Sequence, residues 1–227
     1  MDPCTQGLLG AVLSASIAKK KQLKTATFAG GIGGIAPDLD ILIQSSNDPL
    51  LFIEYHRHFT HSLFFAPFGG ILVTLFLYVF LKHKISFKYL YLFTTLGFFS
   101  HGLLDSCTSY GTTLYWPISN DRVAWNIISI IDPVYTLSLI ISAFLCLKYK
   151  SIILVRIGLF SSFIYLALGY IKHQKISNYI YSIAEQRGHK IERILLNPTI
   201  GNNILWRTIY KFENFYYINA VHMPVFK

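Results

Sequence analysis

The sequence is poor in charged residues. Charged side chains make up 14% of the 227 residues and apolar side chains 53%. Ordinary soluble domains carry about a quarter charged residues, so the composition argues against a soluble globular domain. Aromatic residues are abundant, with 18 Phe and 15 Tyr, as is typical of chains that pack in lipid and at its interfaces. The composition therefore favours a helical bundle in a membrane.

Cysteines and acidic residues are also scarce. The three cysteines, Cys4, Cys107 and Cys146, are widely spaced, which excludes a disulfide framework and a CxxC metal pair. The 11 acids are outnumbered by 20 Lys and Arg, for a formal net charge of +9. Because the basic residues lie in short clusters between apolar runs, we interpret them as membrane-flanking charges and expect no nucleic-acid partner.

We find no internal repeat and no signal-peptide pattern. The start, MDPCTQGLLG, is acidic where a basic region would stand, and the apolar stretch 7–18 lacks a cleavage site before the lysines. We therefore expect internal apolar segments to direct membrane insertion.

Long apolar runs dominate the first three quarters of the chain. Four of them match a membrane-crossing helix of about 20 residues. These runs are 63–81, 89–107, 127–147 and 152–171. Two shorter stretches, 7–18 and 25–36, predict a helical hairpin that either crosses the membrane or packs against the bundle. The fold predicted is an all-α membrane protein with four long transmembrane helices and an N-terminal short helical hairpin.

The C-terminal part, 172–227, is more polar. Residues 173–196 predict an amphipathic helix, because isoleucines recur there at helical spacing. The run WRTIYKFENFYYINAV (206–221) is rich in β-branched and aromatic residues and predicts strands. We therefore expect a membrane domain over 1–171 that carries the site, and a small extramembrane α+β domain over 172–227.

The basic residues also predict an orientation. Ten Lys and Arg lie in the connections 19–24, 82–88 and 148–156. The stretches 37–62 and 105–126 contain only Arg57 and Arg122. Because cytoplasmic loops carry the excess of Lys and Arg, we expect a multi-pass inner-membrane protein with 37–62 and 105–126 on the external, periplasmic face.

Metal-competent side chains gather in three runs at the ends of apolar segments. The runs are PDLD (37–40), HRHFTHS (56–62) and SHGLLD (100–105). The six candidate ligands are Asp38, Asp40, His56, His61, His101 and Asp105. Ionisable groups at the edge of a bilayer cost free energy, and they usually persist because they pair, bind an ion or react. The clustering predicts a metal or catalytic site on the external face.

The spacing within the runs allows the side chains to converge. His101 and Asp105 stand four residues apart, so a helix places both on one face. Asp38 and Asp40 follow Pro37 and would point the same way from an extended segment. Imidazole with carboxylate fits zinc best, with manganese or iron as alternatives. Each pair alone could instead be a turn residue or a helix-stabilising contact.

Three further features leave alternatives open. His58 either adds a ligand or is simply solvated. Asp132 precedes Pro133 within the third apolar run, and it either pairs with a partner or caps a helix. The polar loop 109–113 either donates hydrogen bonds to substrate oxygens or shapes a turn.

The motifs TQGLLG, PDLD, HRHFTHS, HGLLDSCTSYGT, IIDP and NPTIGNNILWR, in this order, resemble those of a known family. It comprises the bacterial membrane-bound metal-dependent hydrolases, which are LexA-regulated and inner-membrane-associated. The resemblance extends over about residues 1–210. It implies a multi-span inner-membrane protein with metal-dependent hydrolase activity. The six candidate ligands named above match the family's motif residues.

We therefore predict an enzyme that hydrolyses an ester or phosphoester. A divalent metal would lower the pKa of a bound water from about 15.7 to about 7. Asp40 or Asp105 would act as general base or orient a histidine, and Arg57 and Thr60 would steady a phosphate or carbonyl oxygen. A site at the interface points to membrane lipids as partners and a lipid-linked substrate. The alternative is a metal-ion or small-solute transporter, which would need polar residues throughout the spans.

Overall fold

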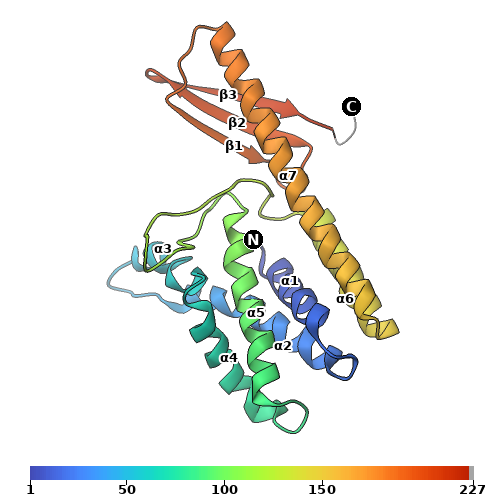
Figure 1. Cartoon of the computed structure of the whole chain (residues 1–227). Helices are drawn as coiled ribbons and strands as arrows, with labels where there is room; N and C mark the ends of the chain where they lie inside the picture. The colour runs from blue at the N-terminus through green and yellow to red at the C-terminus, as the bar shows by residue number, and fades with distance from the viewer. Residues whose placement is uncertain (225–227) are drawn as a thin grey trace.

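A computed structural model describes residues 1–224 as a helical bundle joined by one long helix to a small β-sheet (Figure 1). The α-helices are α1 (Pro3–Ile17), α2 (Leu23–Ile35), α3 (Leu51–Tyr55), α4 (Ala66–Leu81), α5 (Phe87–Ser106), α6 (Pro133–Tyr149) and α7 (Ile152–Gln186). The 3-10 helices are η1 (Lys20–Gln22), η2 (Ala36–Leu42) and η3 (Phe59–His61). The strands are β1 (Arg193–Pro198), β2 (Leu205–Phe212) and β3 (Phe215–His222).

The prediction of an all-α membrane protein with four long transmembrane helices was wrong. Within residues 1–224, only α7 is long and apolar enough to cross a membrane. A second span arises only if Leu51–His61 and Ala66–Leu81, bent by 90°, are taken together. The apolar runs overestimated the helices, because α4 has 16 residues and α6 has 17, fewer than the about 20 that a crossing needs. Helix α5 has 20 residues but includes Lys88, His101 and Asp105.

The N-terminal hairpin of α1 and α2 packs closely on α5. Asp2 caps α1 by accepting a hydrogen bond from the Thr5 amide at 2.9 Å. A Cβ on Gly10 or on Gly97 would collide with the carbonyl oxygen of Gly30. Glycine at these positions therefore allows three backbones to touch, and this contact brings the C-terminal end of α2 beside α5.

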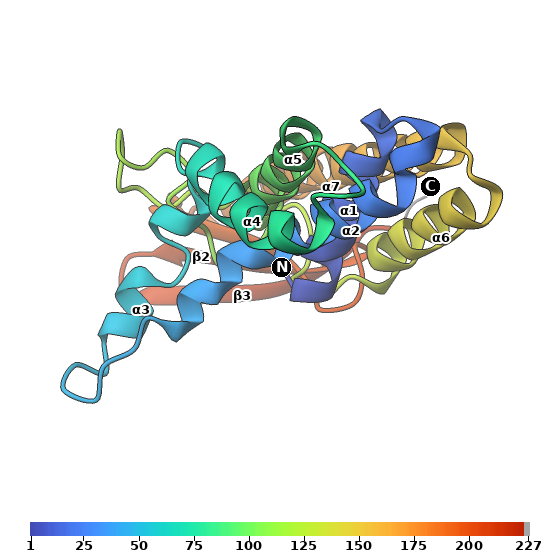
Figure 2. The ribbon, with the colours of Figure 1, turned by 90° about the horizontal axis from the view of Figure 1, so that it is seen from below.

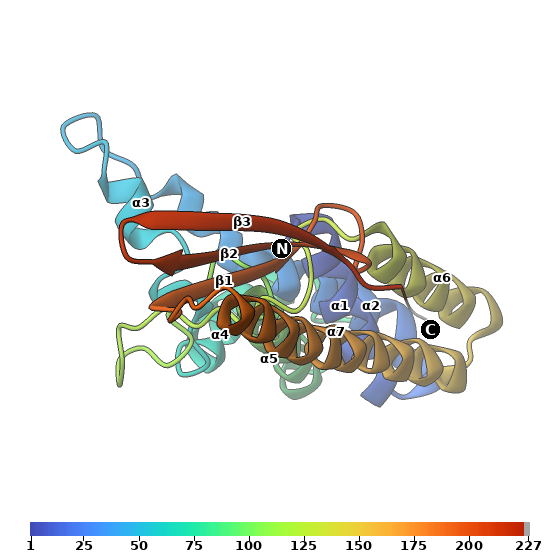
Figure 3. The ribbon, with the colours of Figure 1, turned by 90° about the horizontal axis from the view of Figure 1, so that it is seen from above.

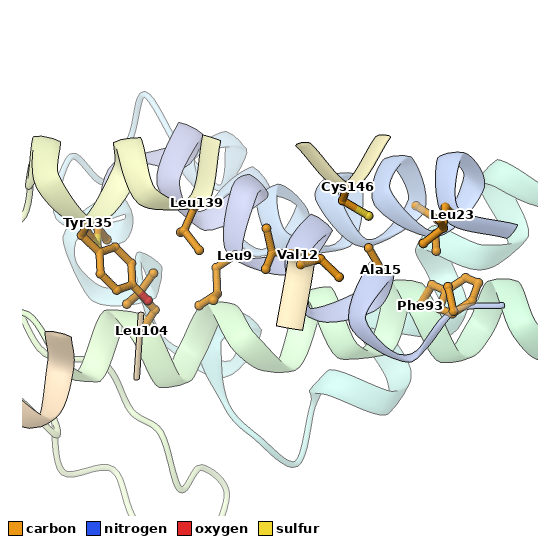
Figure 4. Packing of buried hydrophobic residues seen from close by; sticks show 14 of the residues in the cluster. Leu9, Val12, Ala15, Leu23, Phe93, Leu104, Tyr135, Leu139 and Cys146 are labelled. Carbon is orange, nitrogen blue, oxygen red and sulfur yellow. The ribbon is translucent and has the colours of Figure 1, made fainter. Parts of the chain in front are cut away.

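The core of the bundle lies between α1, α5 and α6. Leu9 and Val12 of α1 face Leu104 of α5 and Leu139 of α6 there, and all four are buried (Figure 4). The outer faces of α4, α6 and α7 expose apolar side chains, which include Phe76, Phe144 and Phe160. A bundle with an apolar exterior is suited to a lipid environment.

The C-terminal half of α7 carries the sheet. The helix predicted over 173–196 is not separate: α7 continues to Gln186, and β1 takes part of the remainder. Strands β2 and β3 occupy the run predicted to form strands, and the antiparallel order is β1-β2-β3. Ile180 of α7 belongs to one buried cluster with Trp206 and Tyr210 of β2. Figure 3 shows α7 running alongside β1. The predicted domain boundary at 171/172 lies within α7.

The lysine-rich connections gather at the end of the bundle that lies away from the sheet (Figures 1 and 2). A cavity of about 750 Å³ lies at this end. The lysines that line it are Lys20, Lys21, Lys24, Lys84 and Lys150. The residues of the three metal-competent runs lie at the other end, where α5 finishes.

Candidate metal centre

Three short structures bring the candidate ligands together: η2, η3 and the last turns of α5. Gly102 allows the contact between α5 and η3, because a Cβ there would collide with the carbonyl oxygen of His61. His101 precedes this glycine and Asp105 follows it, both fully buried. The glycine thus places His61 of η3 directly against the face of α5 that carries His101 and Asp105.

The PDLD run is not extended as the sequence suggested, because residues 36–42 form the 3-10 helix η2. The side chains of Asp38 and Asp40 therefore contact different atoms. Asp38 Oδ1 lies 3.5 Å from His101 Nε2 and 3.6 Å from His61 Nε2. Asp40 instead lies against the Nδ1 side of His61, at 3.3 Å. The two carboxylates thus approach His61 from opposite sides of its ring.

Four residues meet at the centre. The Nε2 atoms of His61 and His101 lie 2.9 Å apart. Asp105 Oδ2 lies 3.3 Å from the first and 3.8 Å from the second. Ligand atoms of Asp38, His61 and His101 all lie within 4.8 Å of one another. In a tetrahedral zinc site with bonds of about 2.0–2.1 Å, ligand atoms lie about 3.3 Å apart, so the distances here fit a zinc-sized ion.

The protonation of the two imidazoles follows from their other nitrogens. His101 Nδ1 lies 2.6 Å from the carbonyl oxygen of Gly34, which can only accept, so Nδ1 carries the proton. His61 Nδ1 faces the Asp40 carboxylate, so its proton is on Nδ1 too. With both rings neutral, the two Nε2 atoms would present lone pairs to each other, an arrangement that needs a cation between the rings. Burial lowers the pKa of His61, but hydrogen bonds to Asp105, Asp38 and Asp40 outweigh it and raise the pKa to about 10. Without a metal ion, a proton on His61 Nε2 therefore occupies this place, and a bound metal would displace it.

Unpartnered polar atoms gather at the same place. Oδ2 of Asp38 and Oδ2 of Asp105 are buried without a hydrogen-bond partner among the described residues, and so is Oε1 of Gln6. A buried polar atom without a partner costs about 1–3 kcal/mol, more if it is charged. Oxygen atoms of this kind beside two imidazole lone pairs are a donor set for a divalent metal.

Gln6 is a site residue that sequence reasoning missed. It is fully buried in α1, and its Nε2 donates to Asp105 Oδ1 at 2.7 Å. The amino group of Met1 also contacts this oxygen. The available signal was a polar residue at the start of an apolar stretch, within the TQGLLG motif.

Asp40 is a positioning residue for His61. Its Oδ2 accepts from the Arg57 amide at 2.9 Å and from Thr60 Oγ1 at 2.8 Å, and its Oδ1 lies 2.8 Å from His56 Nδ1. Burial raises the pKa of Asp40, but hydrogen bonds to His56 and His61 outweigh it and hold the pKa well below its usual range. The anion therefore fixes the tautomer and the ring orientation of His61.

The remaining candidates lie around this core. His56 Nδ1 contacts Asp40, and the His56 ring lies edge-on to that of His61, with centroids 6.2 Å apart; Thr60 also donates to Asp40. Arg57 Nε lies 3.5 Å from Asp105 Oδ2. The ring of His58 instead lies against Trp116, with centroids 6.0 Å apart. These residues surround the metal-competent core without entering it.

The two other open features, Asp132 and the polar loop 109–113, make structural contacts. Asp132 lies outside the centre, where it caps α6 by accepting from the Tyr135 amide at 3.1 Å. In the polar loop, Thr112 and Thr113 donate to the carbonyl oxygen of Arg57. Both features therefore contribute to structure, and the loop supports Arg57.

Comparisons with known proteins identify the family. The profile of the family described as YdjM inner membrane protein matches residues 1–176. An uncharacterized protein of Bacillus subtilis (strain 168), YfhP, is 32% identical over 125 residues, which are 55% of this chain and 37% of that protein. The inner membrane protein YbcI of Escherichia coli (strain K12) is 34% identical over 110 residues, 45% of this chain and 61% of YbcI. Each match thus covers less than two thirds of the relative, and no solved structure matches. The chain belongs to the YdjM family of inner membrane proteins.

Proposed function

We propose that this inner-membrane protein is a metal-dependent hydrolase of esters or phosphoesters. Asp38, His61 and His101 would hold a divalent metal, with zinc the best fit, and the fourth position would be left for water. The observation that carries the proposal is the pair of Nε2 atoms that face each other at 2.9 Å beside unpartnered carboxylate oxygens. A metal bound there would supply a Lewis acid and a water of lowered pKa.

The chain's own residues would orient and move protons. Asp40 keeps the proton of His61 on Nδ1, and Gly34 does the same for His101. Asp38 is the most open carboxylate of the centre, with 17% of its side chain exposed, and its Oδ2 has no partner among the described residues. Asp38 would therefore serve as a ligand, whereas Asp105, whose Oδ2 lies 3.3 Å from His61 Nε2, would accept a proton from the attacking water and return it to the leaving oxygen.

We further infer that the protein is multi-pass, with the centre at the external, periplasmic face. Lysines from three separate connections surround one cavity at the opposite end of the bundle. Lys and Arg are retained on the cytoplasmic side, so this end would face the cytoplasm. The apolar outer faces of α4, α6 and α7 support a bundle that lies within the bilayer. An interfacial centre supports a lipid-linked substrate.

Metal analysis of the purified full chain tests the proposal. We expect about one zinc per chain, and loss of zinc in His61→Ala and His101→Ala, because each removes a ligand. The matched control is His83→Ala, an exposed histidine, which should keep its zinc. A panel of carboxylic esters and phosphoesters would then be assayed with and without a chelator. Unchanged zinc in both site variants would refute the metal centre. Zinc flux into proteoliposomes without hydrolysis would favour the transporter alternative.

A further inference from the structure

A second cavity adjoins the metal centre. It has a volume of about 420 Å³ and lies between α3 and the polar loop that follows α5. Its lining residues are Phe52, Ile53, His56, Arg57, Tyr110 and Arg122. Two of the six are arginines and none is acidic, so the cavity combines positive charge with apolar walls. Nothing in the proposed metal centre requires such a cavity.

Arg57 joins this cavity to the metal centre. The residue is only 8% exposed, and its guanidinium carbon lies 4.9 Å from the ring centroid of Tyr110. Its Nε lies 3.5 Å from Asp105 Oδ2, whereas its Nη1 has no hydrogen-bond partner among the described residues. A buried, charged N–H donor without an acceptor is costly. The ring and the carboxylate hold the guanidinium in place and leave one donor available.

The backbone of Arg57 is also fixed, by hydrogen bonds to its amide and its carbonyl group. Its φ is 64°, a left-handed conformation that is uncommon for a residue other than glycine. The amide donates to Asp40 Oδ2, and the carbonyl oxygen accepts from the amide of Thr113 at 3.2 Å and from Thr112 Oγ1 at 3.2 Å. The surrounding structure therefore imposes the conformation and fixes the starting point of the Arg57 side chain.

Arg122 supplies a second positive charge at the open side of the cavity. Its Nη2 donates to the carbonyl oxygen of His56 at 3.2 Å and to that of Ile53 at 3.4 Å. These contacts tie the exposed loop to α3 and keep the guanidinium beside the cavity. Guanidinium groups present planar sets of donors that match the oxygens of a phosphoryl group.

We propose that this cavity binds the phosphoryl group of the substrate, with Arg57 Nη1 donating to one of its oxygens. This inference rests on the proposed hydrolase and narrows it to phosphoesters. In the reaction, water adds to phosphorus while the bond from phosphorus to the leaving oxygen breaks. A proton from the water ends on the leaving oxygen, so the products are an alcohol and a phosphate. Water is the only co-reactant.

Binding of inorganic phosphate to the purified full chain tests this inference. We expect Arg57→Lys to weaken phosphate binding by about tenfold or more, because an ammonium group lacks the forked donors, while zinc content is retained. Arg122→Met, at an exposed position, should weaken it by about threefold through loss of charge. Arg193→Lys, an exposed arginine on β1, is the matched control and should bind as the parent does. Titration calorimetry with zinc-loaded and with chelated protein measures both effects.

The outcomes separate the two proposals. Equal phosphate affinity in the parent, Arg57→Lys and Arg122→Met would overturn the phosphoryl cavity and leave the metal centre intact. If Arg57→Lys does not fold, unchanged binding in Arg122→Met is sufficient to overturn it. An absence of zinc together with phosphate binding that needs Arg57 would refute the metal centre and support the cavity. Phosphate release from glycerol phosphate or from phosphatidic acid in mixed micelles would then distinguish a soluble source from a lipid.

Discussion

Buried carboxylates occur in two clusters of this protein, Asp132 with Tyr135 and Tyr165, and Asp38 and Asp105 with the two histidines, and the two clusters are built differently. Asp132 is fully buried, but its Oδ1 accepts from the Tyr135 amide and its Oδ2 accepts from the Tyr165 hydroxyl at 2.7 Å. Among the described residues, Oδ2 of Asp38 accepts no hydrogen bond, and Oδ2 of Asp105 accepts none either, with only an ion-pair contact to Arg57 Nε at 3.5 Å besides the two histidines. The first cluster is complete with the protein's own donors, and the second is not.

The difference separates a structural acid from a functional one. A satisfied carboxylate at a helix N-terminus stabilises that helix and leaves no oxygen for other chemistry. A carboxylate beside two facing imidazole nitrogens needs a cation between them, either a proton or a metal ion. Burial alone does not distinguish the two cases, since Asp105 and Asp132 are equally inaccessible. The two cases are distinguished by whether each carboxylate oxygen has a hydrogen-bond donor.

The largest expected effect is on metal affinity at the incomplete cluster. We expect Asp38→Ala to lower zinc affinity by more than about a hundredfold, because even residues that only orient a ligand contribute about 10- to 100-fold. The stability of the metal-free protein should change by less than about 1 kcal/mol, since an unpartnered buried oxygen is removed together with its contacts to histidine. Zinc competition with a chromophoric chelator and thermal unfolding measure the two quantities. Parental zinc affinity would contradict the assignment of Asp38 as a ligand.

The sequence predicted the contents of the centre better than its geometry. Helical spacing placed His101 and Asp105 on one face, and the structure has Nε2 and Oδ2 of this pair 3.8 Å apart. The separation of Asp38 from Asp40 was not predictable from an extended PDLD, because η2 packs against α2, η3, α4 and α5, contacts that the local sequence does not reveal. Gln6 was missed because its partner, Asp105, lies 99 positions away in the chain.

The same limit applies to the fold. Apolar composition predicted where helices occur, but a run such as 127–147 includes an irregular stretch before α6 begins at Pro133. Hydropathy does not indicate where a helix begins. The start of α6 is instead indicated by Asp132 as N-cap and by proline at the first helical position. Strand β1 was not expected, since its partner is β2 and the pairing is tertiary.

The complete cluster should respond in stability instead of metal binding. We expect Asp132→Ala to destabilise the fold by about 2–4 kcal/mol, because α6 loses its cap and the Tyr165 hydroxyl loses its acceptor. Zinc stoichiometry and affinity should stay at the parental level under conditions where the variant is folded. Thermal unfolding in detergent and zinc competition provide the measurements. A loss of zinc affinity in folded Asp132→Ala would mean that the two clusters are coupled and would remove the distinction between them.

The smallest expected effect is on zinc affinity in a variant of Asp40. This carboxylate is fully hydrogen-bonded like Asp132, but it lies beside the metal centre like Asp38. Asp40→Asn keeps an amide oxygen for the Arg57 amide and Thr60, and it removes the charge that faces His61 Nδ1. We expect zinc affinity to fall by about tenfold, the lower end of the range for a residue that orients a ligand. Asp121→Asn, at an exposed carboxylate that accepts from Ser119, is the matched control. An unchanged affinity would make Asp40 a structural acid like Asp132, and a loss as large as that of Asp38→Ala would make it a ligand, because only a residue that acts through His61 gives the intermediate result.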